Sequence, residues 1–152
     1  MIRDYFPDDI KPYMIPRPRP DLYYQCLGCA AEHSVEKLLY VCPECGQVLM
    51  IQDRGAEKLR QIPGHLWRKI FDFRKLLKQP ELQGIYRYHE FIGPCIPLSS
   101  VVYLGEGHTP VIQANATLQE AAGVCFYYKN DGQNPSASFK DRGMASAISS
   151  IK

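Results

Sequence analysis

The sequence has 152 residues, of which 45% are hydrophobic and 22% are charged, as in ordinary globular proteins. A formal net charge of only +2, without a strong basic cluster, argues against nucleic acid as a partner. No apolar run reaches membrane-spanning length, and charges occupy the N-terminal positions where a signal peptide would be apolar. We therefore expect a cytoplasmic protein of one domain or two small domains, with no membrane partner.

Residues 1–22 begin the chain with a run in which proline alternates with arginine, Pro-Arg-Pro-Arg-Pro at 16–20. This composition predicts an extended, polyproline-like arm. A proline-rich motif for a partner protein is one interpretation of the arm. A plain lead-in to the first domain is the interpretation that we favour.

Residues 23–52 contain two Cys-x-x-Cys pairs separated by twelve residues, Cys26 with Cys29 and Cys42 with Cys45. Each pair follows an apolar, β-prone run, so the pattern predicts two turns on short strands. Two such turns supply four sulfur ligands for tetrahedral zinc and leave no open position, which indicates a structural metal. Two disulfides, a redox pair and an iron centre are the alternatives, and a reducing cytosol disfavours the disulfides.

The residues after the two pairs differ. Gly46 follows the second pair and suits a tight turn, whereas the first pair has Ala30 at that place and Gly28 inside it. The two turns are therefore expected to differ slightly. Acidic residues outnumber basic ones around the pairs, which does not favour nucleic-acid binding by a zinc ribbon.

Residues 63–79 show helical periodicity. Hydrophobic residues recur at intervals of four, three and four, at Leu66, Ile70, Phe73 and Leu77. Pro63 suits the first turn of a helix and Pro80 ends the pattern. We expect the apolar face of this helix to pack on the core or on a partner.

The sequence of residues 101–152 predicts strands that alternate with helices. Residues 101–112 indicate a strand, a glycine loop and the start of a second strand, and a short helix should run from its N-cap Asn115 to Gly123. Residues 124–130 predict a strand with Cys125 as a small core residue. A helix should begin near Lys140. Strand, loop and helix make half of a βαβ unit, so we expect an N-terminal piece of a longer protein.

Lys140 lies in the run Asn-Pro-Ser-Ala-Ser-Phe-Lys-Asp-Arg-Gly, residues 134–143. A lysine becomes a nucleophile when its amine is neutral at physiological pH. The adjacent Phe139 and the positive end of a helix dipole both favour the neutral amine. Asn134 and Ser138 offer short polar groups on the same loop. The alternative is a solvated surface lysine, which is the commoner state of this residue.

Four segments, in this order, resemble the threonine synthase family: residues 84–94, 104–110, 127–135 and 134–143. The last resembles the family signature Asn-Pro-Thr-Gly-Ser-Phe-Lys-Asp-Arg-Gly, with Ser136 and Ala137 replacing Thr and Gly. In the earlier segments Tyr86 replaces Trp and Asp131 replaces Glu. These enzymes use pyridoxal 5′-phosphate and are related to the tryptophan synthase β subunit. Some members carry an N-terminal zinc ribbon.

The resemblance implies an α/β fold. A zinc ribbon at residues 23–52 would precede the start of a fold-type II pyridoxal-phosphate-dependent domain with three layers, incomplete at residues 53–152. It also implies that Lys140 forms the Schiff base with the cofactor and that Phe139 lies against the pyridine ring. Three residues are expected either to line the substrate site or, equally, to cap loops: Asn134, Ser138 and Thr109. For Lys129, Asp141 and Arg142 we favour structural roles over contact with the substrate.

The resemblance implies conversion of O-phospho-L-homoserine and water to L-threonine and phosphate, in threonine biosynthesis. The alternatives are a related enzyme such as a cysteate synthase, which uses phosphoserine and sulfite, and a non-catalytic zinc-ribbon binding module. In this family the loop that holds the cofactor phosphate follows the lysine helix. We therefore expect this chain to be inactive by itself, with exposed apolar edges that favour aggregation or a homo-oligomer.

Overall fold

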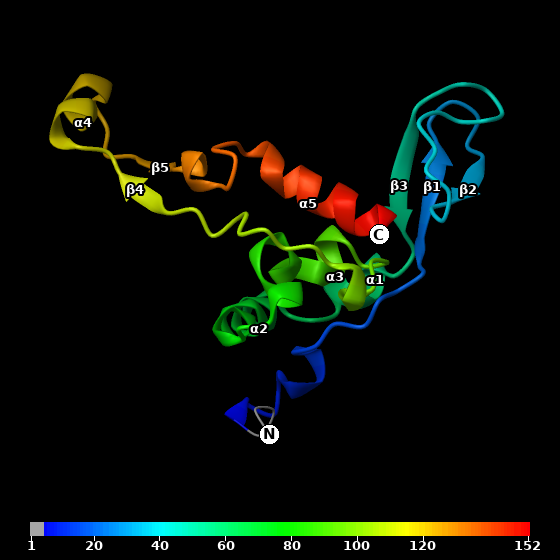
Figure 1. The fold of residues 1–152 in the computed structure, drawn as a ribbon, viewed down its shortest axis with the longest axis horizontal. Coiled ribbons are helices and arrows are strands. Elements are labelled where there is room, and N and C mark those ends of the chain that lie inside the picture. The colour runs from blue at the N-terminus through cyan, green and yellow to red at the C-terminus, as the bar shows by residue number, and fades with distance from the viewer. Residues whose placement is uncertain (1–4) are drawn as a thin grey trace. The chain divides into compact units, whose positions relative to one another are not determined.

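The computed structural model describes residues 5–152, which form two compact units of mixed α/β structure (Figure 1). The first unit runs to Phe73 and includes Pro94–Pro97, and the second comprises Arg74–Gly93 and Leu98–Lys152. None of the helices in residues 5–152 combines the length and the hydrophobicity that a bilayer crossing requires. The arm predicted for residues 1–22 lies partly outside the described residues.

The first unit contains a three-stranded antiparallel sheet in the order β2-β1-β3. Strand β1 spans Leu22–Cys26, β2 spans Glu32–Ser34 and β3 spans Leu49–Asp53. The first cysteine pair forms the turn between β1 and β2, and the second pair precedes β3. The prediction is confirmed for the first turn, whereas the apolar run before the second pair forms no strand and the second turn instead leads into β3.

The arm is packed against the first unit. A 3-10 helix, η2 (Lys11–Tyr13), interrupts the predicted extended conformation. Ile10 and Met14, which flank this helix, are fully buried, so burial of their side chains opposes an extended path. Further along, Arg19 donates two hydrogen bonds to Asp53 of β3, at 3.1 and 2.8 Å. Ile10 and Met14 therefore contribute to the core of this unit, and Arg19 ties the following residues to β3.

Two helices follow the sheet, α1 (Ala56–Arg60) and α2 (Gly64–Leu76). The helix predicted at residues 63–79 is confirmed by α2. Ile70 is fully buried, and the ring of Trp67 stacks on Phe71 with centroids 5.5 Å apart. The indole Nε1–H of Trp67 donates to Leu59 O of α1 at 3.2 Å, so the predicted apolar face packs on the core of the chain itself.

The second unit begins with short helical turns, η3 (Pro80–Leu82), η4 (Gly84–Tyr88) and α3 (His89–Ile92). Arg74 is fully buried and donates to both carboxylate oxygens of Glu90, at 2.8 and 2.5 Å. Tyr86 is also fully buried, and its hydroxyl donates to Ala145 O at 2.8 Å. This last hydrogen bond ties the turns to the C-terminal helix.

The rest of the second unit comprises η5 (Leu98–Ser100), β4 (Val111–Gln113), α4 (Ala116–Ala122), β5 (Tyr127–Lys129), η6 (Asp131–Gln133) and α5 (Lys140–Ile151). Strands β4 and β5 are antiparallel, with α4 connecting them (Figure 1). The Asn115 side chain accepts a hydrogen bond from Leu118 N at 2.9 Å, and Gly123 has φ +67°. Both predicted caps of α4 are therefore confirmed.

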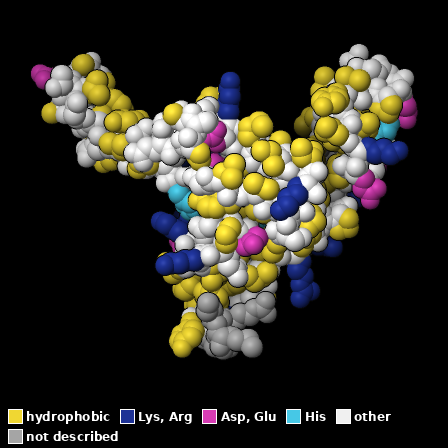
Figure 2. Space-filling view, viewed as in Figure 1, with side chains coloured by type: hydrophobic (Ala, Val, Ile, Leu, Met, Phe, Trp, Pro, Cys, Tyr) yellow, Lys and Arg dark blue, Asp and Glu magenta, His cyan; other side chains and the backbone are white. Residues whose placement is uncertain are grey.

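Two predictions for this unit are wrong. The strand predicted at the start of residues 101–112 is absent, because Val102 N donates to the side chain of Ser149 and Leu104 N to that of Glu106, instead of to a neighbouring strand. Cys125 was predicted in the core but is exposed. It lies just before β5, whose three residues are all exposed, and hydrophobic side chains are visible across the surface (Figure 2). The apolar composition of residues 124–130 predicted that Cys125 is buried, but the two-stranded sheet leaves most of this segment exposed.

Candidate functional site

The four cysteines of the two turns form one cluster, with all four sulfur atoms within 4.8 Å of one another. Cys26 Sγ lies 3.4 Å from Cys45 Sγ, and Cys29 Sγ lies 3.7 Å from Cys42 Sγ. A tetrahedron of sulfurs at the usual zinc distance of about 2.3 Å has edges of about 3.8 Å. The cluster could therefore hold a metal ion with little movement.

The two turns have the same backbone hydrogen bond at the same position. Ala30 N donates to Cys26 O at 3.1 Å, and Gly46 N donates to Cys42 O at 2.8 Å. Ala30 and Gly46 both adopt the left-handed conformation, with φ +61° and +73°. The expected difference between the turns is therefore absent from this part of the backbone, because alanine occupies the conformation that glycine favours.

Two thiols of the cluster have pKa values shifted in opposite directions. Hydrogen bonds from Cys29 N and Gly28 N, partly offset by burial, lower the pKa of the Cys26 thiol to about 6. At Cys29, the bond from Ala31 N lowers the pKa, but the neighbouring sulfurs and burial outweigh it and raise the pKa to about 12. The surroundings thus lower the pKa of one thiol and raise that of its neighbour, and a bound cation would favour the thiolate form of its ligands.

The second unit holds Lys140 as the first residue of α5, where it is exposed to solvent. Its backbone N–H donates to Ser138 Oγ at 3.2 Å. Phe139 occupies the N-cap position, and 66% of its surface is exposed. The two residues predicted to contact a cofactor therefore lie together, accessible, at the start of a helix.

Hydrogen bonds of two neighbouring residues, Asp141 and Arg142, hold the start of α5 in place. Asp141 accepts hydrogen bonds from the backbone N–H of Ser136, at 2.8 Å, and from its hydroxyl. Arg142 donates to both oxygens of Asp131, at 2.8 and 2.7 Å. The bonds from Arg142, and then from Thr109, lower the pKa of Asp131 to about 2. Asp141 and Arg142 thus have the structural role that we favoured.

The three predicted substrate residues belong to the same loops. Asn134 is 4% exposed and accepts a hydrogen bond from Gly107 N at 3.0 Å. Thr109 is also buried, and its hydroxyl donates to Asp131 at 2.7 Å. Ser138 is half-buried. All three side-chain groups serve loop structure here, and their contact with a substrate stays a prediction.

Lys129 lies at the end of β5, and its Nζ donates to Thr109 O at 2.8 Å. This bond agrees with the structural role that we favoured. Lys129 also acts on His108. Burial is the main cause that lowers the pKa of His108, and the positive charges of Arg87, Lys75 and Lys129 lower it further. Sequence reasoning did not single out His108, although it lies within the segment 104–110 that resembles the family.

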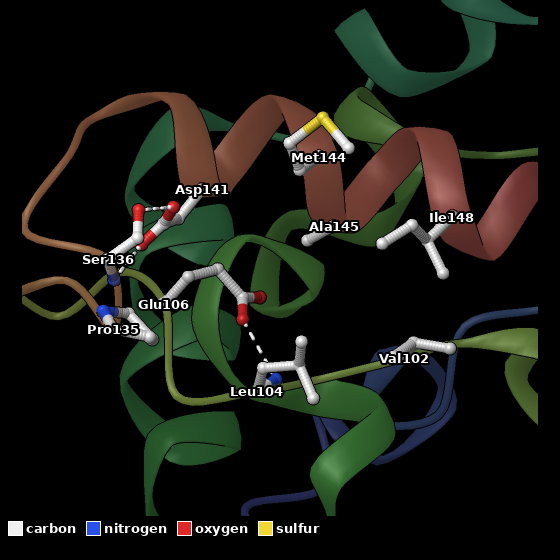
Figure 3. Close-up of a pocket in the computed structure, with 9 residues that line it drawn as sticks. All are labelled: Val102, Leu104, Glu106, Pro135, Ser136, Asp141, Met144, Ala145 and Ile148. Atoms are coloured by element: carbon white, nitrogen blue, oxygen red, sulfur yellow. Dashed lines mark hydrogen bonds between the residues drawn. The ribbon is translucent and has the colours of Figure 1, made fainter.

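A cavity of about 260 Å³ lies between α5 and the segment 102–106 of the second unit (Figure 3). It is lined by Val102, Leu104, Glu106, Pro135, Ser136, Asp141, Met144, Ala145 and Ile148. Glu106 is 1% exposed and accepts a hydrogen bond from Leu104 N at 3.0 Å. Sequence reasoning missed this residue, although an acid between two glycines was a usable signal.

Comparison with known proteins gives evidence that is independent of this geometry. A threonine synthase from Methanocaldococcus jannaschii is 31% identical over 132 residues, which are 82% of this chain and 27% of that protein. The chain is similar to the threonine synthases. One from Methanosarcina acetivorans is 27% identical over 83% of this chain and 27% of its own length, and one from Synechocystis is 48% identical over 39% of this chain and 16% of its own. No protein-family model matches the chain.

The resemblance predicted from the sequence motifs is thus confirmed. The chain spans about a quarter of the length of the first two threonine synthases. Together with the cysteine cluster, this similarity defines two candidate sites within one chain, a metal site in the first unit and the Lys140 loop in the second.

Proposed function

We propose that this chain is the lysine-bearing portion of a threonine synthase, which converts O-phospho-L-homoserine and water to L-threonine and phosphate. The observation that carries the proposal is the placement of Lys140, an exposed amine at the start of a helix that Asp141 and Arg142 tether. It occurs in a chain similar to threonine synthases over 82% of its length. Residues 53–152 would form part of a fold-type II domain.

Pyridoxal phosphate, when bound, supplies the electron sink for this chemistry. Lys140 supplies the amine that would hold the cofactor and then move protons to and from the substrate. Phe139, exposed beside it, offers an apolar surface for the ring.

The test uses the native protein that carries this sequence, incubated with O-phospho-L-homoserine. We expect threonine and phosphate to form in equal amounts, and we expect Lys140→Ala to abolish both. Borohydride reduction with pyridoxal phosphate should label Lys140 in the unchanged protein. Activity with phosphoserine and sulfite instead would favour a cysteate synthase. Failure to take up the cofactor at all would favour a non-catalytic zinc-ribbon module.

We further propose that the cysteine cluster holds one structural Zn²⁺. The four sulfurs account for the whole tetrahedral coordination, and their spacing fits it. The expected result is one zinc per chain, measured by elemental analysis after purification under reducing conditions. Substitution of both buried ligands, Cys26→Ser with Cys42→Ser, should remove the metal, whereas Cys125→Ser, outside the cluster, should retain it.

A further inference from the structure

The two cysteine turns differ at one sulfur. In the first turn, Gly28 N and Cys29 N approach Cys26 Sγ at 3.3 and 3.5 Å. Cys42 is the corresponding cysteine of the second turn. Within residues 5–152, the nitrogen that approaches its sulfur is His33 Nε2, at 3.5 Å. A side chain from outside the second turn thus takes the place that backbone N–H groups occupy in the first.

The sheet places His33 beside this sulfur. His33 is the central residue of β2 and pairs with Tyr24 of β1. Strand β1 ends at Cys26, so the register that positions the first turn also positions the imidazole. A shift of one residue would turn His33 to the opposite face of the sheet. The contact therefore depends on the same strand pairing as the cluster.

We propose that His33 is a positioning residue of the metal site, and that its Nε2–H donates a hydrogen bond to the Cys42 sulfur. The inference rests on the proposed zinc site. A metal-bound thiolate can only accept hydrogen bonds, so it selects the tautomer with the proton on Nε2. Such a bond restrains the ligand and withdraws electron density from the sulfur. Loss of groups that orient metal ligands typically weakens metal binding by about 10–100-fold.

The experiment compares the unchanged 152-residue chain with His33→Ala, His33→Gln and His65→Ala under reducing conditions. His65 is an exposed histidine of α2 in the same unit, so it controls for the loss of an imidazole. Zn²⁺ affinity is measured by competition with a chromophoric chelator. Co²⁺ is the second probe, because its thiolate charge-transfer bands report on the electron density of the sulfurs.

We expect His33→Ala to bind Zn²⁺ about 10–100-fold more weakly. Its Co²⁺ charge-transfer band should move to longer wavelength, because a sulfur without the hydrogen bond is more easily oxidised. His33→Gln can donate an amide N–H and should recover part of both effects. His65→Ala should match the unchanged chain in both measurements.

Three results would overturn the proposal. Weaker Zn²⁺ binding by His33→Ala with an unmoved Co²⁺ band would mean that His33 only supports the fold of β2. A Co²⁺ spectrum typical of three sulfurs and one nitrogen in the unchanged chain would make His33 a ligand. If the unchanged chain binds neither ion, the zinc proposal itself fails, and this is recognised before any variant is measured.

Discussion

Within residues 5–152, three residues other than glycine have positive φ angles: Ala30 at +61°, His108 at +52° and Ala137 at +57°. Each carries a conformational cost, because the left-handed region brings Cβ close to the following carbonyl oxygen. Ala137 stands where the family signature has glycine. The substitution therefore keeps the side chain small but places backbone strain in the loop that precedes Lys140.

Ala137→Gly should relieve this strain and stabilise the chain by about 1 kcal/mol. Urea denaturation, monitored by circular dichroism, measures the change in the free energy of unfolding. Ala147→Gly is the matched control, since Ala147 is exposed in the interior of α5. The control should lose about 1 kcal/mol. Equal losses in both variants would show that residue 137 does not need the left-handed conformation.

Gly84→Ala should destabilise the second unit. Gly84 has φ +56°, and a Cβ there would lie 2.6 Å from Glu106 O and 2.8 Å from Glu106 Oε1. Backbone strain and overpacking together should cost about 2 kcal/mol or more, seen as a lower urea midpoint. Gly143→Ala in α5 meets no atom within 4 Å and should instead stabilise the helix by about 1 kcal/mol.

At the scale of elements, the start of α5 depends on contacts with two loops. Arg142 joins it to Asp131 of η6 and, through a hydrogen bond of 3.1 Å, to Thr109 before β4. Asp141 joins it to Ser136 of the intervening loop. Lys140 lies directly before both of these residues, so the same contacts restrain its backbone.

The Asp131–Arg142 pair predicts a specific acid dependence. The folded-state pKa of Asp131, about 2, lies below the ordinary aspartate value of 3.8. The pair therefore contributes stability above about pH 4, and this contribution disappears as the pH falls through 2. The stability difference between the unchanged chain and Asp131→Asn should be largest above pH 4 and should shrink towards pH 2, measured by urea denaturation at each pH.

Asp72→Asn is the control for this experiment, because Asp72 is exposed on α2. It should follow the unchanged chain across the pH range. A stability difference for Asp131→Asn that stays constant between pH 5 and pH 2 would contradict a stabilising ion pair at α5.

At the scale of the molecule, metal removal should affect the two units unequally. The cysteine cluster lies in the first unit, and α5 lies in the second. If the cluster holds zinc, a chelator should raise amide hydrogen exchange in β1, β2 and β3, because metal binding contributes to folding of its ligand turns. Exchange in α5 should stay unchanged. Loss of protection in both units at once would show that they unfold together.

The sequence by itself determined the elements that local patterns specify. The paired cysteines predicted two turns that share one cluster, the intervals of apolar residues predicted α2, and Asn115 with Gly123 marked the ends of α4. Each of these features depends on residues close together in the chain. The motifs around Lys140 also identified the resemblance to threonine synthases, because their order and residue types are specific.

Only the tertiary structure decided the features that join distant residues. Residues 101–104 are β-prone, yet the N–H groups of Val102 and Leu104 pair with the side chains of Ser149 and Glu106. Ala30 occupies a left-handed turn in spite of its Cβ, and His33 reaches a sulfur nine residues along the chain. Strand register and loop packing set these contacts, and no local pattern of residues encodes them.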